Sequence, residues 1–198
     1  MKTCLFTVLA LLGAVTAEAS CLDSLPAHRA QTESEYLKSD DSPFDKEMRE
    51  RFAGFSYFAG DAAYCVDASF ERTAGEKQFD MAAFNGKTIP FRKYGVFRFQ
   101  LGGAMRSLVA YQRMDVPAAE RNWVLVPFQD GTNGKETYGG GRYLEIKFPI
   151  RSRTVLDFNH AFNPLCAYDA KFRCPIPPPQ NRLAIAVTAG EKAYAGAH

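Results

Sequence analysis

The sequence lacks the features that mark a nucleic-acid-binding protein. Its 24 basic and 22 acidic residues nearly cancel, which leaves a formal charge of +2. The basic residues are scattered along the chain, whereas nucleic-acid-binding domains gather Lys and Arg on one face. Tryptophan occurs once, and the 16 Phe and 9 Tyr residues mostly alternate within strand-like runs. Because this alternation favours core packing over base stacking, we predict no nucleic-acid partner.

Well-understood catalytic and nucleotide-binding signatures are also missing. The chain has no H-E-x-x-H motif, no G-x-S-x-G motif, and no G-x-G-x-x-G placed between a strand and a helix. Residues 131–137, GTNGKET, are similar to a phosphate-binding loop, but their glycine spacing differs and Glu136 stands where Ser or Thr would coordinate magnesium. We therefore predict no cofactor, and the sequence leaves open whether the protein is an enzyme.

Long apolar runs are confined to the N-terminus. Lys2 precedes an apolar run from Cys4 to Val15, and small residues follow at positions 17 and 19. This pattern is typical of a secretory signal peptide and is too short for a membrane-spanning helix. We predict a signal peptide over residues 1–19, one domain over residues 20–198, a secreted or extracytoplasmic location, and no membrane association after cleavage.

Cysteine is scarce, but its number after cleavage is even. The mature chain would retain Cys21, Cys65, Cys166 and Cys174. In an oxidising compartment, four cysteines predict two disulfides among three possible pairings. The short spacing favours a local bridge between Cys166 and Cys174, with Cys21 and Cys65 as a possible second pair, and unpaired buried thiols are the alternative.

A metal site can be assembled from the residues near these cysteines. Asp157 and His160 precede Cys166 and Cys174 and would complete a set of four ligands. Their spacing matches no zinc-binding pattern, and disulfide formation competes for both thiols. We therefore predict no metal.

The order of elements predicts a mainly β protein. Residues 30–52 have a helical pattern, in which Ser42, Pro43 and Asp45 suit a helix start, and Gly54 follows its end. Period-two alternation then begins near residue 64, and Asn85-Gly86 is a strong hairpin signal. Segments such as VFRFQL, WVLVPF, RYLEIKF, RTVLDF and RLAIAVTA bring the expected strands to about eight. We predict an antiparallel β-sandwich or barrel with a helical N-terminal extension.

Two polar loops contain most of the side chains that could bind or react. The first, residues 128–144, combines five glycines with Asp130, Thr132, Thr137, Tyr138 and Arg142. The second, residues 157–183, contains Asp157, Asn159, Asn163 and Asn181 among prolines that favour an extended path. A solvated turn and asparagines that satisfy loop backbone groups are the simpler interpretations.

Three functional hypotheses follow from these loops. A rigid β scaffold could bind a small polar or anionic molecule through Thr132, Thr137, Tyr138, Arg142, Asn159, Asn163 and Asn181. Alternatively, Asp130 and Asp157 could share acid and base roles in a hydrolase or isomerase, with Tyr138 as a further proton donor. A third hypothesis makes the loops a stabilising polar network. Because no nucleophile with its base is recognisable, we favour a binding protein with a small-molecule ligand.

The two loops also resemble a known family. The pattern FxDxTxGxxTYGxGRYL falls on residues 128–144 and DFNxAxNPxCAY on residues 157–168, followed by CPxPPxxNxL on residues 174–183 and AGEK on residues 189–192. Together they resemble the bacterial, archaeal and fungal family catalogued as domain of unknown function 1684, over roughly residues 36–194. This resemblance implies that the two loops are the family's signature, and it implies no activity.

Overall fold

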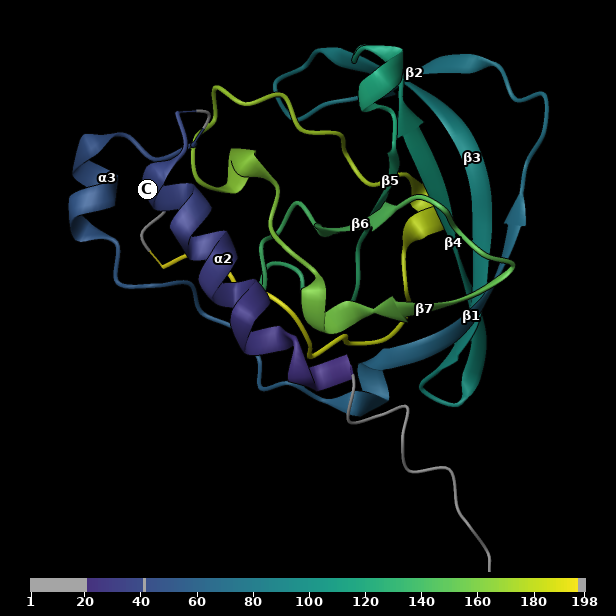
Figure 1. Ribbon diagram of the computed structural model, residues 1–198, viewed down its shortest axis with the longest axis horizontal. Coiled ribbons are helices and arrows are strands. Elements are labelled where there is room, and N and C mark those ends of the chain that lie inside the picture. Colours follow the sequence, from purple (N-terminus) through teal and green to yellow (C-terminus); the bar gives the residue numbers. More distant parts are fainter. Residues whose placement is uncertain (1–20, 41, 196–198) are drawn as a thin grey trace, which may run out of the picture.

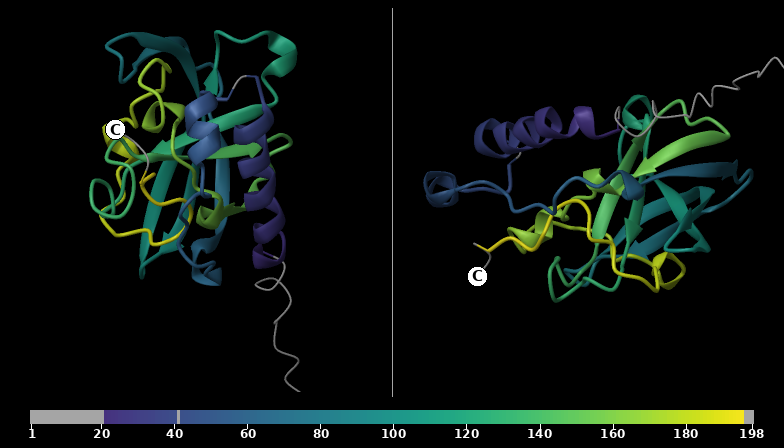
Figure 2. Two further views of the ribbon diagram at one scale, coloured as in Figure 1. Left: turned by 90° about the vertical axis from the view of Figure 1, so that its left-hand side faces the viewer. Right: turned by 90° about the horizontal axis from the view of Figure 1, so that it is seen from below.

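The computed structural model describes residues 21–40 and 42–195. The predicted signal peptide, residues 1–19, therefore lies outside the described residues. An antiparallel sheet curls into a half-barrel, and the N-terminal helices lie to one side of it, with long loop segments between helices and sheet (Figures 1 and 2). This arrangement confirms the predicted fold class.

The sheet contains seven strands in the order β6-β5-β4-β3-β1-β7, and β2 pairs with β3 beside this path. Every strand pair is antiparallel. The strands are β1 (Cys65–Arg72), β2 (Gln78–Ala82), β3 (Thr88–Leu101), β4 (Ala104–Arg113), β5 (Trp123–Phe128), β6 (Arg142–Lys147) and β7 (Arg153–Asp157). The long strand β3 lies in the middle, so most of the hydrophobic alternation in the sequence is organised around it.

Glycines close the two hairpins that flank β3. Gly86, between β2 and β3, has a φ of 73°, which confirms the hairpin predicted from Asn85-Gly86. Gly102 and Gly103, between β3 and β4, have φ values of 60° and 75°. Positive φ at both central residues is what a type I′ turn requires, and this turn matches the twist of the strands that it joins.

Both faces of the sheet are covered along β4 and β5, where buried residues run without interruption. Phe97, Phe99 and Leu108 belong to a core on one face, and Phe91 and Tyr111 belong to a second core on the other. Successive side chains of a strand point to opposite faces, so a strand between two cores has apolar residues without interruption. This accounts for the continuous run WVLVPF in β5, which lies between β4 and β6.

The helices differ from the prediction in their bounds. Within the predicted helical region at residues 30–52, the structure has α2 (Leu25–Lys38), which begins earlier, and α3 (Lys46–Arg51), which begins after Asp45. Asp45, rather than Ser42, caps α3, because its Oδ1 accepts the N–H of Met48 at 2.8 Å. The Ser42 hydroxyl instead donates to the carbonyl of Tyr36 and accepts the N–H of Phe44. Short 3₁₀ turns are η1 (Ala62–Tyr64), η2 (Ala118–Glu120), η3 (Phe158–His160), η4 (Leu165–Ala167) and η5 (Pro179–Asn181).

The segment RLAIAVTA, residues 182–189, is not a strand. It touches the sheet path through a single bridge between Gln129 and Arg182. Beyond this bridge, the carbonyl of Val187 accepts an Arg142 N–H, and the carbonyl of Ile185 accepts the N–H of Gly131 in a loop. The strand prediction failed because side-chain and loop donors occupy acceptors that a neighbouring strand would otherwise pair.

A disulfide and several polar contacts hold α2 to the rest of the protein. Cys21, just before α2, is bonded to Cys65 at the start of β1. Arg29 donates to the carbonyl of Phe58 at 2.9 Å, and Glu33 accepts the N–H of Phe55 at 3.0 Å. Within the described residues, none of the helices has the length and apolar character needed to cross a bilayer.

We expect the Cys21–Cys65 disulfide to stabilise the fold by closing a long loop. The two cysteines are 44 residues apart, and loop-closure entropy for this separation corresponds to about 3–4 kcal/mol. The double variant Cys21→Ser/Cys65→Ser should lose this amount of unfolding free energy in urea denaturation. Cys166→Ser, which alters a thiol outside the bridge, is the control and should lose less. Equal stability of the oxidised protein and the double variant would contradict the expectation.

Candidate functional site

A buried ion pair closes the first polar loop. Asp130 follows β5 and Arg142 begins β6, and the Arg142 Nη2 atom lies 2.9 Å from Asp130 Oδ2. Both side chains are fully shielded from solvent. Burial lowers the pKa of Arg142, and the neighbouring Asp130 carboxylate opposes this shift, so the guanidinium remains charged. The pair therefore joins the two ends of the loop at residues 128–144.

Arg142 also binds the C-terminal segment. Its Nη2 donates to the carbonyl of Val187 at 2.8 Å, and its Nη1 donates to the carbonyls of Ala189 and Glu191. A guanidinium has five N–H donors in a fixed plane, so one buried arginine can collect several carbonyls from an irregular segment. Arg142 thus fixes residues 187–191 against the sheet.

The remaining oxygen of Asp130 is fully used inside the loop. Asp130 Oδ1 accepts the N–H of Thr132 at 2.8 Å, the Thr132 hydroxyl at 2.6 Å, and the N–H of Val187 at 3.2 Å. The hydroxyls of Thr132 and Thr137 are 2.8 Å apart. The structure therefore brings Asp130, Thr132, Thr137 and Arg142 together, as the sequence suggested, but these side chains face one another and not an open cavity.

The side chain of Asn181 supplies hydrogen bonds to β4 and β5, which have few ladder hydrogen bonds of their own. The register of β4 with β5 is limited to Tyr111 opposite Leu125. The Asn181 side chain accepts the N–H of Val109 at 2.8 Å and donates to the carbonyls of Val109 and Pro127 at 2.9 and 2.7 Å. A side-chain amide has the donor and acceptor of a peptide group, so it replaces missing ladder hydrogen bonds. Asn181 is fully buried in this position.

Glu191 is a buried carboxyl group that the sequence analysis did not select. It accepts the Tyr168 hydroxyl on Oε1 and the N–H of Asn163 on Oε2, the latter at 2.9 Å. The Asn163 amide donates in turn to the carbonyl of Lys192 at 2.8 Å. Burial raises the pKa of Glu191 to about 7, although these hydrogen bonds and Arg142 favour the charged form. Its position in the AGEK pattern was the sequence feature that could have identified it as a candidate.

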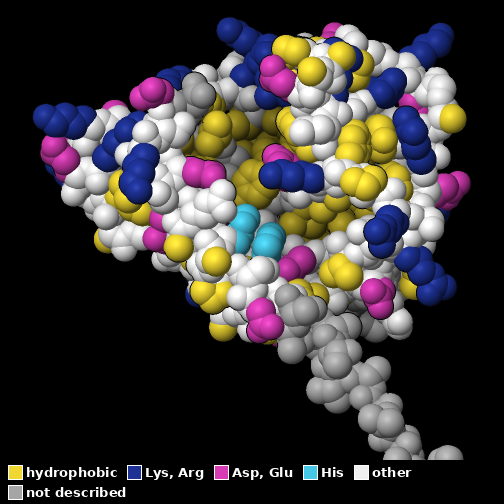
Figure 3. Space-filling view, viewed as in Figure 1, with side chains coloured by type: hydrophobic (Ala, Val, Ile, Leu, Met, Phe, Trp, Pro, Cys, Tyr) yellow, Lys and Arg dark blue, Asp and Glu magenta, His cyan; other side chains and the backbone are white. Residues whose placement is uncertain are grey.

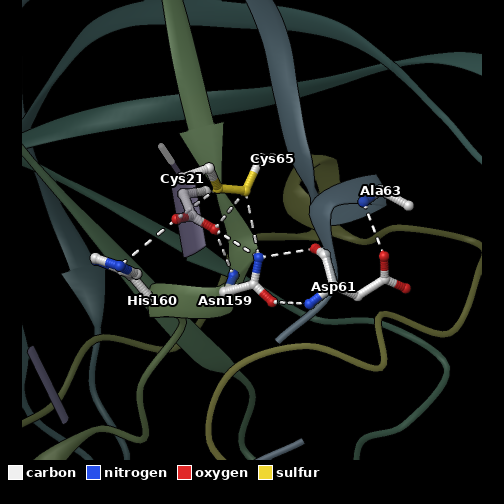
Figure 4. Close-up of a disulfide and its surroundings, with 7 residues drawn as sticks. Cys21, Asp61, Ala63, Cys65, Asn159 and His160 are labelled. Carbon is white, nitrogen blue, oxygen red and sulfur yellow. Dashed lines mark hydrogen bonds and ion pairs between the residues drawn. A yellow bond between two sulfur atoms is a disulfide. The ribbon is translucent and has the colours of Figure 1, made fainter. Parts of the chain in front are cut away.

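The second predicted carboxylate belongs to a separate cluster. Asp157 ends β7 beside the Cys21–Cys65 disulfide, where Asn159 donates to Asp157 Oδ1 through its backbone N–H and its side chain, both at 2.9 Å (Figure 4). His160 Nε2 lies 3.5 Å from Asp157 Oδ2. The His160 ring stacks on His28 with centroids 4.2 Å apart, and burial lowers the pKa of His28.

The two loops converge at one end of the sheet, but aromatic rings fill the space between them. Strands β5 and β7 run in the same direction, because an even number of antiparallel steps relates them, so Asp130 and Asp157 follow the same edge. The rings of Phe128 and Phe158 pack between these edges with centroids 5.4 Å apart. Each carboxylate has its own set of donors. The arrangement therefore gives no support to an acid–base pair.

Tyr138, Cys166 and Cys174 meet where the loops pack against each other. The Tyr138 hydroxyl lies 3.9 Å from Cys166 Sγ, and Cys174 Sγ accepts the N–H of Cys166 at 3.1 Å. Both thiols are free, so the predicted Cys166–Cys174 bridge is wrong, whereas the second pair that the sequence suggested, Cys21–Cys65, is present. In this geometry Cys174 acts as a hydrogen-bond partner of Cys166. The partnership lowers the pKa of Cys166, against the effect of burial, and raises that of Cys174.

An open cleft of about 520 Å³ lies on the outside of the first loop. It is lined from one side by Gln129, Asp130, Gly131, Asn133 and Gly139, and from the other by residues 182–186. Arg182 is exposed and donates to Gln129 Oε1 at 2.7 Å. Both predicted loops thus contribute to one concave surface, although Asp130 is the one residue of its lining that the sequence analysis had selected.

Comparisons with known proteins agree with this fold. The model of the family described as "Protein of unknown function (DUF1684)" matches residues 50–192, which confirms the resemblance seen in the sequence. The solution NMR structure of an uncharacterized protein from Haloarcula marismortui is similar, with a TM-score of 0.69 and 32% sequence identity, covering 88% of this chain and 95% of that chain. No curated protein matches the chain.

We expect the Arg142–Asp130 pair to be essential for stability. Arg142→Met would leave the Asp130 carboxylate buried and unpaired, which costs about 3–5 kcal/mol of unfolding free energy. Arg98→Met is a matched control, because Arg98 forms an exposed ion pair with Glu71 at 2.6 Å, and such pairs contribute about 1 kcal/mol or less. Urea denaturation of both variants tests the difference. Similar losses in the two variants would show that the buried ion pair contributes no more to the unfolding free energy than the exposed one.

Glu191 should make the fold less stable as pH rises. Its pKa is about 7 in the folded protein and near the ordinary value of 4.5 when unfolded. Between these values the folded state binds a proton that the unfolded state has lost, so unfolding free energy falls with rising pH, by about 3 kcal/mol in full. In denaturation at several pH values, Glu191→Gln should remove this slope. If the unfolding free energies of the two proteins change with pH in parallel, Glu191 is not the source of the slope.

Proposed function

Because the chain belongs to the DUF1684 family, whose description names no activity, we propose its function from the site alone. The proposed function is the binding of a small polar or anionic molecule in the cleft between the loop at residues 128–144 and the segment at residues 182–186. The observation that carries this proposal is the exposed guanidinium of Arg182 beside a carboxylate that is already neutralised.

The charges of the cleft support an anionic ligand. Asp130 is the carboxylate among the lining residues, and its ion pair with Arg142 removes its repulsion toward an anion. Arg182 uses one guanidinium nitrogen to reach Gln129, so other N–H groups remain directed to solvent. An arginine fork suits planar carboxylate and phosphate groups through paired hydrogen bonds. A ligand at this position would therefore meet one fixed positive charge.

Neutral groups on the same surface would complete recognition. Gln129 and Asn133 supply side-chain amides, and Gly131 and Gly139 leave backbone exposed. The Asn133 side chain is fixed by hydrogen bonds to the Asp130 N–H at 2.6 Å and to the Tyr138 carbonyl at 2.9 Å. Fixed polar groups reduce the conformational entropy lost on binding. In this proposal Thr132, Thr137 and Arg142 hold the cleft wall in place and do not touch the ligand.

We also propose that the protein acts outside the cytoplasm. The N-terminal pattern at residues 1–19 predicts export. The Cys21–Cys65 disulfide supports the proposal, because such bonds persist mainly in oxidising compartments. Intact-mass analysis of the exported protein would test it, with cleavage near residue 17 or 19 as the expected result and an uncleaved chain as the contrary one.

Ligand binding in the cleft should raise the melting temperature. Phosphate, sulfate, citrate and neutral sugars serve as probes in a thermal-shift assay, and an anion at about 100 times its Kd adds about 2.7 kcal/mol of stability. For a protein of this size that corresponds to a shift of roughly 5–10 °C. Arg182→Ala should abolish the shift, and Arg182→Lys should retain part of it.

The matched control is Arg151→Ala, which removes an exposed arginine outside the cleft. This variant should keep the full shift. A shift that survives Arg182→Ala, or one that Arg151→Ala removes equally, would place anion binding elsewhere or make it a nonspecific charge effect. No shift with any anion would overturn the proposal.

A further inference from the structure

Three potential metal ligands meet at the joint between α2 and the sheet. The sulfur atoms of Cys21 and Cys65 and a carboxylate oxygen of Asp157 all lie within 4.8 Å of one another. Cys21 precedes α2, Cys65 begins β1, and Asp157 ends β7 opposite Cys65 in the strand register. The cluster is half-buried and lies apart from the proposed ligand cleft.

The carboxylate of Asp157 is oriented toward the two sulfurs. Asn159 binds Oδ1 through two N–H groups, and it is itself fixed by hydrogen bonds to the backbone of Asp61 at 2.9 and 3.0 Å (Figure 4). This leaves Oδ2 directed at Cys21 Sγ, 3.2 Å away. Neighbours that orient a carboxylate in this way are typical of metal sites.

His160 supplies a fourth possible ligand. Its Nε2 atom is shielded from solvent and has no hydrogen-bond partner among the described residues, although it lies 3.5 Å from Asp157 Oδ2. Stacking on His28, with ring planes within 9°, holds the imidazole in this orientation. Figure 3 shows histidine side chains at the border of a hollow in the molecular surface. A buried nitrogen without a partner is unfavourable unless something binds it.

We propose that, once the Cys21–Cys65 bond is reduced, these two cysteines, Asp157 and His160 bind one Zn²⁺ or a similar divalent ion. Tetrahedral zinc with bonds of about 2.3 Å to sulfur and 2.0 Å to oxygen or nitrogen requires roughly 3.5 Å between sulfur and oxygen, and 3.3 Å between nitrogen and oxygen. The corresponding distances here are 3.2 Å from Cys21 Sγ and 3.4 Å from Cys65 Sγ to the carboxylate, and 3.5 Å from His160. To complete the site, the two sulfurs must move apart, and the His160 ring must move closer to them, because His160 is not among the side chains whose ligand atoms all lie within 4.8 Å of one another.

The disulfide and the metal are alternatives for the same sulfur atoms. A dithiol reductant supplies two electrons and two protons to the S–S bond, which breaks to give two thiols while the reductant becomes a disulfide. Metal binding then releases the two thiol protons, because thiolates are the ligands. The Asn159 amide, 3.4 Å from Cys65 Sγ, can donate to the resulting thiolate. Oxidised and metal-bound forms would therefore both hold α2 to β1.

Cobalt titration tests the site. The probe is Co²⁺ added without oxygen to the reduced full-length protein carrying Cys4→Ser, Cys166→Ser and Cys174→Ser, which leaves Cys21 and Cys65 as the two cysteines. We expect one equivalent to bind with a micromolar or lower Kd and to produce the thiolate-to-cobalt absorption of a tetrahedral site. Zn²⁺ should displace Co²⁺ and raise the melting temperature. His160→Ala and Asp157→Asn should weaken binding at least tenfold, and His28→Ala should weaken it less.

Two further proteins separate this proposal from incidental binding. The oxidised protein and the Cys21→Ser/Cys65→Ser variant should not show the thiolate absorption. If reduction unfolds the chain, circular dichroism should show that Zn²⁺ restores the fold, and failure to do so would overturn the proposal. Absence of cobalt binding by folded, reduced protein, or unchanged affinity in both ligand variants, would also overturn it. These results are independent of the anion-binding test, because none of the ligands lines the cleft.

Discussion

One buried arginine, Arg142, needs several hydrogen-bond acceptors, and this need determines how the surrounding segments are arranged. The Arg142 guanidinium cannot lose its charge inside a protein and cannot remain unpaired there, so its N–H groups must find oxygen atoms. Asp130 and the carbonyls of Val187, Ala189 and Glu191 accept from Nη1 and Nη2, whereas Nε has no partner among the described residues. This requirement determines where residues 187–191 run, although they form no strand. It also places the Glu191 side chain beneath Asn163 and Tyr168.

The polar residues of the family pattern therefore serve mainly to join loops that regular secondary structure does not hold. Asp130 and Thr132 shape the first loop, Asn181 connects β4 with β5, and Asn163 binds the C-terminal segment. Most donors and acceptors of this network have partners, although Arg142 Nε and Asn163 Oδ1 have none among the described residues. The two sites that we propose for outside molecules lie at the margins of the network, at Arg182 and near Asp157. A shared pattern of residues can thus describe a common framework without describing a common activity.

Local patterns predicted much of the sheet. Alternation in VFRFQL, the apolar run WVLVPF and the turn at Asn85-Gly86 depend on neighbouring residues, and each corresponds to an observed element. Features that depend on distant partners were harder to predict. Asp45 rather than Ser42 caps α3, and RLAIAVTA lacks a ladder because Arg142 and a loop N–H take its carbonyls. Sequence spacing favoured Cys166 with Cys174, whereas the fold bonds Cys21 to Cys65 across 44 positions.

The same limit applied to the candidate site. The sequence singled out the two loops, and many of the selected residues form hydrogen bonds that join loop segments, but side-chain type alone does not reveal whether a donor faces inward or outward. Arg142 and Arg182 are the same residue type in neighbouring parts of the fold, yet one is fully buried and the other is exposed. Their difference arises from which face of the chain meets the sheet, and this is decided by packing over the whole molecule.

The position of Asn181 has a mechanical consequence. Its side-chain amide connects β4 to β5 from the 3₁₀ turn η5, to which Asn181 belongs. The prolines of this turn make its backbone stiff. Strands β5 and β6 therefore cannot shift along β4 unless the proline-containing turn η5 is displaced at the same time. The contact between β4 and β5, which has one residue pair in register, is therefore held together partly by a side chain from outside the sheet.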